Sequence, residues 1–333
     1  MMKKLLEINN LYVSYTSNNE YVRAVNGFNL QIDEGETLGL VGETGAGKTT
    51  AALSIMRLLP ERISKVEQGK IFFEGISLLK LKDKEMQKIR GEKISMIFQD
   101  PMTSLNPVLT IGEQILEGLE LHNTDGKTKD ELMQRVNEML ELVGIPAKRY
   151  NEYPHQFSGG MKQRVVIAMA LACNPRLLIA DEPTTALDVT IQAQVLEIMN
   201  SLKEKFNMAM ILITHDLGVV AETCDNVATV YAGEIIEYGK AEDIFEAEHH
   251  HPYTVGLFRA IPNLNTTEKR LHSIEGLMPD PTDLPEGCKF HPRCPRCMNV
   301  CKYEQPEAIQ LSNTHMIKCH LFNDMDSRRR ESL

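Results

Sequence analysis

The sequence has no long hydrophobic run. Its longest uninterrupted apolar stretch, Val165 to Cys173, has nine residues, whereas a membrane-spanning helix needs about 20. The first residues, MMKKLLEINN, include two lysines but no apolar core of the kind that a signal peptide contains. We therefore expect the chain to stay in the cytoplasm. Any role at a membrane would then require partner chains that hold it there.

An excess of positive charge is also missing. The formal net charge is -10, with 36 Lys and Arg against 46 Asp and Glu. Affinity for nucleic-acid phosphates needs clustered basic side chains. The one basic cluster, Arg328 to Arg330, lies beside the C-terminus and is interpreted as a solvated tail. The composition therefore predicts a protein with no nucleic-acid partner, and 333 residues allow more than one domain.

Strand and helix patterns alternate over the first part of the chain. Short apolar runs in residues 5–41, and again near 70–73, 177–180 and 208–214, predict strands. Apolar residues at helical spacing predict helices over 129–143 and 191–206, and a further helix follows a glycine-rich loop at 49–59. This alternation is typical of an α/β fold with a mainly parallel sheet. Prolines and cysteines become frequent near residue 245, where we place a boundary between domains 1–245 and 246–333.

The strongest chemical signal fits the pattern G-x-x-x-x-G-K-[ST] at every fixed position. Its residues are Gly42, Glu43, Thr44, Gly45, Ala46, Gly47, Lys48 and Thr49, followed by Thr50. Glycines allow such a loop to point its backbone N–H groups at phosphate oxygens, and the start of the next helix adds positive potential. We expect Lys48 to reach the β- and γ-phosphates and the Thr49 hydroxyl to bind Mg²⁺.

A second signal is the apolar run Leu177 to Ala180, which ends in Asp181 and Glu182. A strand of this kind would bring two carboxylates to the sheet edge beside the phosphate loop. Asp181 would hold Mg²⁺ through water, and Glu182 would act as general base on the attacking water. An acidic strand end alone is equally often structural. Together with the phosphate loop, it indicates a nucleotide hydrolase.

The kind of hydrolase is indicated by Phe157-Ser158-Gly159-Gly160-Met161, just upstream of the acidic strand. This segment resembles the signature of the ABC ATPases, L-S-G-G-Q, with Phe157 in place of Leu and Met161 in place of Gln. The serine and both glycines, which would present a hydroxyl and N–H groups to phosphate, are retained. We therefore expect a competent ATPase half.

Further segments are similar to ABC ATPases. The resemblance implies that Gln99 senses Mg²⁺ and the attacking water, that Ala186-Leu187-Asp188 is the D-loop, and that His215 contacts the γ-phosphate. Tyr15 would stack on adenine, although a tyrosine packed in the core is the alternative. The implied fold is a P-loop, RecA-like core with an antiparallel β subdomain and a helical subdomain at about 100–165. ATP and Mg²⁺ are the implied cofactors, and Ser158, Gly159 and Gly160 would complete a site on a partner chain.

Three segments place the chain in one branch of that family. D-P-M-T-S-L-N-P at 100–107, Y-P-H-Q-F at 153–157 and H-P-Y-T at 251–254 resemble the dipeptide and oligopeptide importers, with the permease D-type ATPases closest. The resemblance implies a second, different ABC ATPase, two transmembrane permease subunits and an external binding protein as partners. The chain would lie at the cytoplasmic face of the plasma membrane. Nickel and glutathione importers, and a soluble non-transport ABC ATPase, stay open as alternatives.

The chain has seven cysteines, and its last fifth contains Cys288, Cys294, Cys297, Cys301 and Cys319. In a reducing compartment, such crowding favours metal binding over disulfides. Relatives in this branch carry cysteines at the positions of Cys288, Cys294, Cys301 and Cys319, and some are thought to hold a 4Fe-4S cluster there. Zinc and no metal are the alternatives to this cluster. Cys297 is then an extra thiol or a substitute ligand, and His249 to His251 could form a separate metal patch. A redox-sensing or metal-storage protein would be a separate class, here at most a secondary role.

Overall fold

The computed structural model describes residues 4–17, 20–185, 187–260 and 274–323. The chain divides into two compact units, and each unit is assembled from separate stretches of sequence. The first comprises Met1–Leu5, Ile32–Thr37 and Lys80–Ile213, and the second comprises Leu6–Gln31, Leu38–Leu79 and Thr214–Leu333. No helix in these described ranges is long and apolar enough to cross a bilayer.

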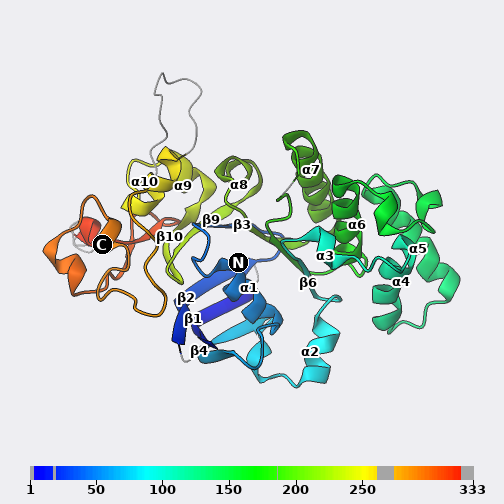
Figure 1. Ribbon diagram of the computed structural model, residues 1–333, viewed down its shortest axis with the longest axis horizontal. Helices are drawn as coiled ribbons and strands as arrows, with labels where there is room; N and C mark the ends of the chain where they lie inside the picture. Colours follow the sequence, from blue (N-terminus) through cyan, green and yellow to red (C-terminus); the bar gives the residue numbers. More distant parts are fainter. Residues whose placement is uncertain (1–3, 18–19, 186, 261–273, 324–333) are drawn as a thin grey trace. The chain divides into compact units, whose positions relative to one another are not determined.

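In the first unit, three buried strands run parallel in the order β6 (Ile94–Ile97), β7 (Leu177–Asp181) and β8 (Ala209–Ile213). Strands buried on both faces need continuous apolar sequence, which these segments have. Figure 1 shows α4, α5 and α6 gathered at one end of this unit. The α-helices are α2 (Asp83–Ile89), α3 (Pro101–Ser104), α4 (Ile111–Leu121), α5 (Lys129–Leu142), α6 (Gly159–Leu171) and α7 (Val189–Phe206).

Helix starts in this unit are fixed by side-chain caps. Thr110 and Thr128 each accept a hydrogen bond from the N–H three residues on, and the glutamate there bonds back, which is a capping box. The helix predicted at 129–143 is confirmed as α5, with Leu132, Val136 and Met139 buried. The helix predicted at 191–206 begins two residues earlier, because Asp188 caps α7 through the Ile191 N–H.

The second unit contains an antiparallel sheet and a mixed sheet. The antiparallel sheet has the order β2-β1-β4-β5, with β1 (Lys4–Ser17), β2 (Glu20–Asp33), β4 (Ser64–Phe73) and β5 (Ile76–Ser77). The mixed part has the order β11-β12-β10-β9-β3, with β3 (Thr37–Val41), β9 (Asn226–Tyr231), β10 (Glu234–Lys240), β11 (Ala308–Gln310) and β12 (Met316–Lys318). Its helices are α1 (Lys48–Met56), α8 (Leu217–Thr223), α9 (Ala241–Glu246) and α10 (Pro252–Arg259).

The predicted α/β fold with an antiparallel β subdomain is thus observed. The helix expected at 49–59 ends at Met56, because Arg57 adopts a left-handed φ of 50° and its N–H closes the helix on Ser54. The strand expected at 70–73 is only the end of β4, whose first residues are polar. Short 3₁₀ helices occupy Leu78–Lys80, Ala147–Arg149, Pro154–Gln156, His291–Arg293, Asn299–Lys302 and His320–Phe322.

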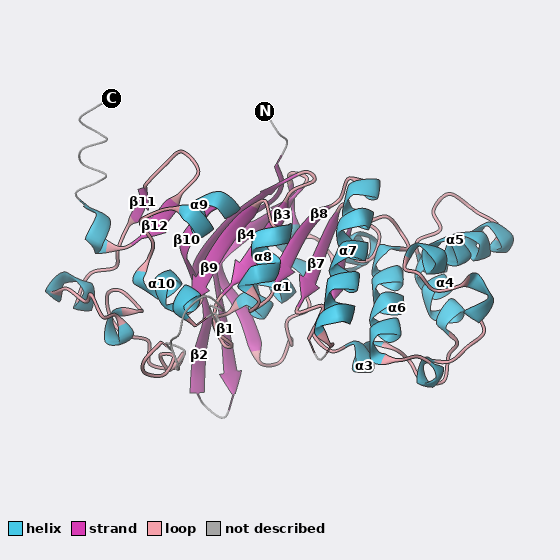
Figure 2. Cartoon of the chain, turned by 90° about the horizontal axis from the view of Figure 1, so that it is seen from above, coloured by secondary structure: helices cyan, strands magenta, loops and turns pink. Residues whose placement is uncertain are grey.

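The C-terminal segment adds strands to the sheet of the second unit. β12 pairs antiparallel with β10, and β11 pairs with β12 (Figure 2). One small core forms around Tyr231, Tyr253 and Phe290, and another around Ile317 and Phe322. The boundary near residue 245 stays a prediction. Arg328 to Arg330 lie outside the described residues.

Candidate nucleotide-binding and hydrolysis site

The loop between β3 and α1 has the backbone shape of a phosphate loop. Gly42, Gly45 and Gly47 have φ values of 147°, 82° and 99°. A Cβ on Gly42 would lie 2.3 Å from the carbonyl oxygen of Val230, and one on Gly47 would lie 2.4 Å from that of Ala24. Only glycine therefore fits at Gly42 and Gly47, and the loop leads directly into the N-terminus of α1, a favourable place for phosphate.

Lys48 is held inside this loop. Its side chain is buried, and its ammonium donates to the carbonyl oxygens of Gly42, at 2.7 Å, and Glu43, at 3.0 Å. The positive charge is thus kept at the loop itself. Two residues on, the Thr50 hydroxyl accepts a hydrogen bond of 3.3 Å from the Tyr15 hydroxyl, so Tyr15 of β1 lies beside α1. Thr49 is exposed.

The acidic residues of the first unit lie at the end of β7. Asp181 is buried, and Glu182 follows it with a left-handed φ of 48°. A non-glycine residue in this region is strained, and such residues are frequent at functional sites. The Glu182 N–H donates to Ile213 of β8 at 2.8 Å. Its carboxylate accepts hydrogen bonds from the Gln99 amide at 2.8 Å and the Thr185 hydroxyl at 2.9 Å.

The contact between Gln99 and Glu182 joins residues 83 positions apart. Gln99 follows β6 and Glu182 follows β7, which are adjacent parallel strands, so both side chains lie at the same sheet edge. The amide would orient the carboxylate that we expect to act as general base. The structure therefore brings together two of the predicted site residues.

The signature residues lie at the N-terminus of α6. Ser158 caps the helix by accepting from the Met161 N–H at 3.4 Å, and both Ser158 and Gly159 are exposed. Gly160 packs against α7, where a Cβ would lie 2.5 Å from a methyl carbon of Ile191. The substituted Phe157 is buried beneath the Arg149 guanidinium. The replacement of Leu by Phe157 therefore changes side-chain packing in the interior, whereas the exposed Ser158 is retained.

The remaining predicted site residues are spread over the two units. His215 is exposed, between β8 and α8, and the next residue, Asp216, caps α8. His215 belongs to the second unit, as do Tyr15 and the phosphate loop, whereas Gln99, Asp181, Glu182 and the signature belong to the first. In the predicted D-loop, Ala186 lies outside the described residues, and Asp188 forms the cap of α7.

The cysteines of the C-terminal segment are unevenly exposed. Cys301 and Cys319 are buried, Cys288 and Cys294 are half-buried, and Cys297 is exposed. Burial, with a further contribution from the nearby thiols of Cys301 and Cys294, raises the pKa of Cys288 to about 11. Burial and the thiols of Cys288, Cys294 and Cys301 likewise raise the pKa of Cys319 to about 12. Cys288 and Cys319 are therefore close enough to neighbouring thiols to be affected electrostatically, and the exposed Cys297 acts on Cys294 in the same way.

A second group of donor atoms was missed by the sequence reasoning. One carboxylate oxygen of Glu237 lies 3.0 Å from His250 Nδ1 and 2.8 Å from His315 Nε2. Within the described ranges, this is the one set of three His, Cys, Asp or Glu residues whose donor atoms all lie within 4.8 Å of one another. Such a set could hold a divalent cation. Of the predicted patch His249 to His251, only His250 contributes a side-chain donor atom.

Hydrogen bonds also satisfy this group without a cation. Burial works to raise the pKa of Glu237, but hydrogen bonds from His250 and His315 outweigh it and lower that pKa to about 2. The other carboxylate oxygen accepts the His251 N–H at 2.9 Å. A buried carboxylate with several donors is stable as the charged form. The group therefore ties β10 to the segments before α10 and β12.

Comparisons with known proteins match most of this chain. The family model "ABC transporter" matches residues 25–185, and the model "Oligopeptide/dipeptide transporter, C-terminal region" matches residues 236–301. A dipeptide transport ATP-binding protein, DppD of Bacillus subtilis, is 50% identical over 322 residues, which cover 96% of this chain and 95% of DppD. The oligopeptide transport ATP-binding protein AppD of the same organism is 48% identical over 325 residues, covering 97% and 98%.

Among solved structures, a dimeric ATP-binding cassette, MJ0796, bound to ADP and Pi has a TM-score of 0.64 and 30% identity. The match covers 71% of this chain and 98% of the MJ0796 chain. The fold, the phosphate loop and these matches define an ABC transporter ATPase. Within that class, the chain belongs to the ATP-binding subunits of the oligopeptide and dipeptide transporter family.

Proposed function

We propose that this ATPase powers the import of di- or oligopeptides. The observation that carries the proposal is the match of the C-terminal region model at residues 236–301, in a chain that aligns over nearly its full length with peptide-transport ATPases. The alternative cargoes within this branch are nickel and glutathione, whose importers have similar ATPases.

At the nucleotide site, we assign roles from the resemblance to ABC ATPases together with the chemistry of each side chain. Lys48 binds the β- and γ-phosphates, and Thr49, Gln99 and Asp181 hold Mg²⁺ directly or through water. Glu182 accepts a proton from the attacking water, with its carboxylate oriented by Gln99 and Thr185. The other assigned contacts are the loop N–H groups to phosphate, Tyr15 to adenine and His215 to the γ-phosphate.

The exposed signature segment supports a nucleotide site that is formed by two ATPase chains. Ser158 and Gly159 face solvent at the N-terminus of α6, where backbone N–H groups favour an anion. We assign Ser158, Gly159 and Gly160 to the nucleotide of a second, different ABC ATPase. Two transmembrane permease subunits and an external binding protein complete the importer, and this chain works at the cytoplasmic face of the membrane.

We assign residues 246–333 to a small cysteine-rich domain that holds a 4Fe-4S cluster through Cys288, Cys294, Cys301 and Cys319. Thiolates are ligands of both iron–sulfur clusters and zinc. Cys288 packs against one small core and Cys319 lies in the other, so shared ligation would join them. The cluster would be structural, and zinc is the second candidate.

The hydrolysis mechanism is tested with the purified importer complex, because the partner ATPase is proposed to complete the nucleotide site of this chain. Glu182→Gln should lower kcat for ATP about 100- to 1,000-fold, because general-base catalysis is removed, while the dissociation constant for MgATP stays within twofold of wild type. Glu197→Gln, an exposed glutamate of α7, is the matched control and should leave kcat unchanged. Wild-type turnover by Glu182→Gln would refute the assigned role.

A further inference from the structure

Arg293 is a buried cation that contacts the phosphate loop from the far end of the sequence. Its side chain is 4% exposed, and its two terminal nitrogens donate to the two carboxylate oxygens of Glu43 at 2.7 and 3.0 Å. The partners are 250 residues apart. A two-pronged contact of this kind fixes the direction of the carboxylate as well as its distance. Glu43 is the second residue of the phosphate loop.

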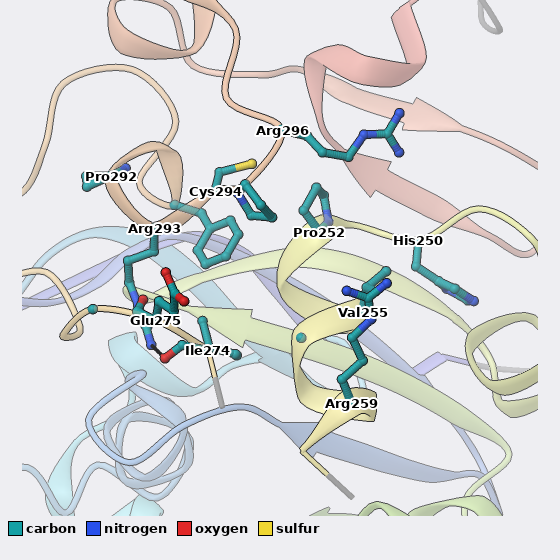
Figure 3. Close-up of a pocket in the computed structure, with 14 residues that line it drawn as sticks. His250, Pro252, Val255, Arg259, Ile274, Glu275, Pro292, Arg293, Cys294 and Arg296 are labelled. Carbon is teal, nitrogen blue, oxygen red and sulfur yellow. Dashed lines mark hydrogen bonds between the residues drawn. The ribbon is translucent and has the colours of Figure 1, made fainter. Parts of the chain in front are cut away.

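The rest of the guanidinium is also held in place. Arg293 Nε donates to the Glu275 carbonyl at 3.0 Å, and one terminal nitrogen lies 3.4 Å from the Ile274 carbonyl. Figure 3 shows the Arg293 side chain extending towards Ile274 and Glu275, at one wall of a pocket of about 810 Å³. Because each guanidinium nitrogen of Arg293 has a hydrogen-bond partner, the side chain is held in one position. It therefore fixes the position of the Glu43 carboxylate.

Tyr253 holds the same residue through the backbone. The Tyr253 hydroxyl accepts a hydrogen bond of 2.8 Å from the Glu43 N–H. The carbonyl of that same peptide unit, on Gly42, accepts from Lys48 at 2.7 Å. One peptide plane of the loop is therefore fixed on both sides, by the lysine that we assign to phosphate and by a tyrosine of α10.

Aromatic packing makes this support rigid. Tyr253 is fully buried, and its ring lies edge-on to Tyr231 and Phe290, with centroids 4.6 and 5.4 Å apart. Such geometry is favourable for aromatic rings and restricts their motion. Phe290 precedes the short 3₁₀ helix His291–Arg293 and Arg293 is its last residue, so one cluster orients both the hydroxyl and the guanidinium.

We propose that Arg293 and Tyr253 are positioning residues of the nucleotide site, and that through them the C-terminal segment sets the affinity for ATP. They act through Glu43 and touch no phosphate themselves. If the peptide plane at Gly42–Glu43 is released, the loop must be ordered when nucleotide binds, and binding weakens. Catalytic groups at the end of β7 are unaffected, so turnover of bound ATP is retained. The proposal rests on the assignment of the phosphate loop made above.

The test measures the dissociation constant for MgATP with the purified full chain, and KM and kcat with the importer complex in which the partner ATPase completes the site. Arg293→Gln and Glu43→Gln should each raise the dissociation constant and KM about tenfold, with kcat within twofold of wild type. The double variant should be no worse than either single one, because both remove the same contact. Tyr253→Phe should raise the dissociation constant about fivefold, by loss of one hydrogen bond.

Arg296→Gln is the matched control. Arg296 lies three residues along, is exposed, and its side chain runs away from that of Arg293 (Figure 3). Its affinity for MgATP should stay within twofold of wild type. If Arg293→Gln fails to fold, Tyr253→Phe carries the test, because it removes one hydrogen bond to the Glu43 N–H and leaves the Arg293–Glu43 pair and the ring packing in place. Arg293→Lys should restore part of the affinity, since it keeps the charge but only one prong.

The proposal is overturned if the folded variants bind MgATP like wild type, or if the losses of the two single variants add in the double variant. A purely structural contact would lower the unfolding temperature and leave the dissociation constant unchanged. A wild-type chain that does not bind MgATP would instead overturn the nucleotide-site assignment itself, and this inference with it.

Discussion

Protonation of His251 should lower the free energy of unfolding of the protein as the pH falls below neutrality. His251 begins α10, where its unprotonated Nδ1 accepts a hydrogen bond of 3.1 Å from the Tyr253 N–H. Burial lowers the pKa of His251 to about 4, although the nearby Glu237 carboxylate opposes this shift. Protonation would therefore both charge a buried ring and remove a helix cap beside the tyrosine that holds the phosphate loop.

The sign and size follow from the two pKa values. In the unfolded chain His251 titrates near 6.5, and in the folded chain near 4. Between these values the unfolded state binds a proton that the folded state does not, so stability falls as the pH falls. From pH 7 to pH 5 the loss attributable to this histidine is about 2 kcal/mol.

The assay is the free energy of unfolding in urea, compared between wild type and His251→Asn at both pH values. Asparagine can accept the same hydrogen bond as a cap but does not titrate. Between pH 7 and pH 5, wild type should therefore lose about 2 kcal/mol more than the variant. Parallel losses in the two proteins would refute the assignment of an unprotonated, buried His251.

Two further predictions concern packing and the proposed cluster. Gly160→Ala should cost about 1–3 kcal/mol of stability, because its Cβ would meet Ile191 at 2.5 Å. Gly118→Ala in α4, with nothing within 4 Å, is the control and should not destabilise the protein in urea unfolding. Cys288→Ser should lose bound iron and acid-labile sulfide, whereas Cys297→Ser should retain both. Equal iron in the two variants would exclude the assigned ligand set.

Local features of this fold could be predicted because their causes are local. The face of α5 follows from apolar residues at helical spacing, and the positive φ values of the phosphate loop follow from its glycines. The first residues of β4 could not be predicted as strand from their own sequence. The polar residues from Ser64 onward are extended because they pair with β1, a long-range contact that overrides local preference.

The site was predictable to the same extent. Glu182 was predicted from the apolar strand before it, whereas Gln99 was expected only from the resemblance to ABC ATPases. Its own strand, β6, was not predicted, and the pairing of β6 with β7 explains the contact. Arg293 and Glu43 give no such signal, because an arginine among cysteines and prolines contains no information about a partner 250 residues away. Glu237 is similar: a glutamate in a strand suggests exposure, and only the fold brings His250 and His315 to it.

The central claim is that ATP hydrolysis at this site drives peptide import. Its most direct test is the uptake of labelled dipeptides, oligopeptides and nickel by the source cells, with Glu182→Gln introduced at this gene and Glu197→Gln as control. We predict that Glu182→Gln abolishes peptide uptake and leaves nickel uptake intact, whereas Glu197→Gln changes neither. Peptide uptake at the wild-type rate in the Glu182→Gln cells would contradict the account.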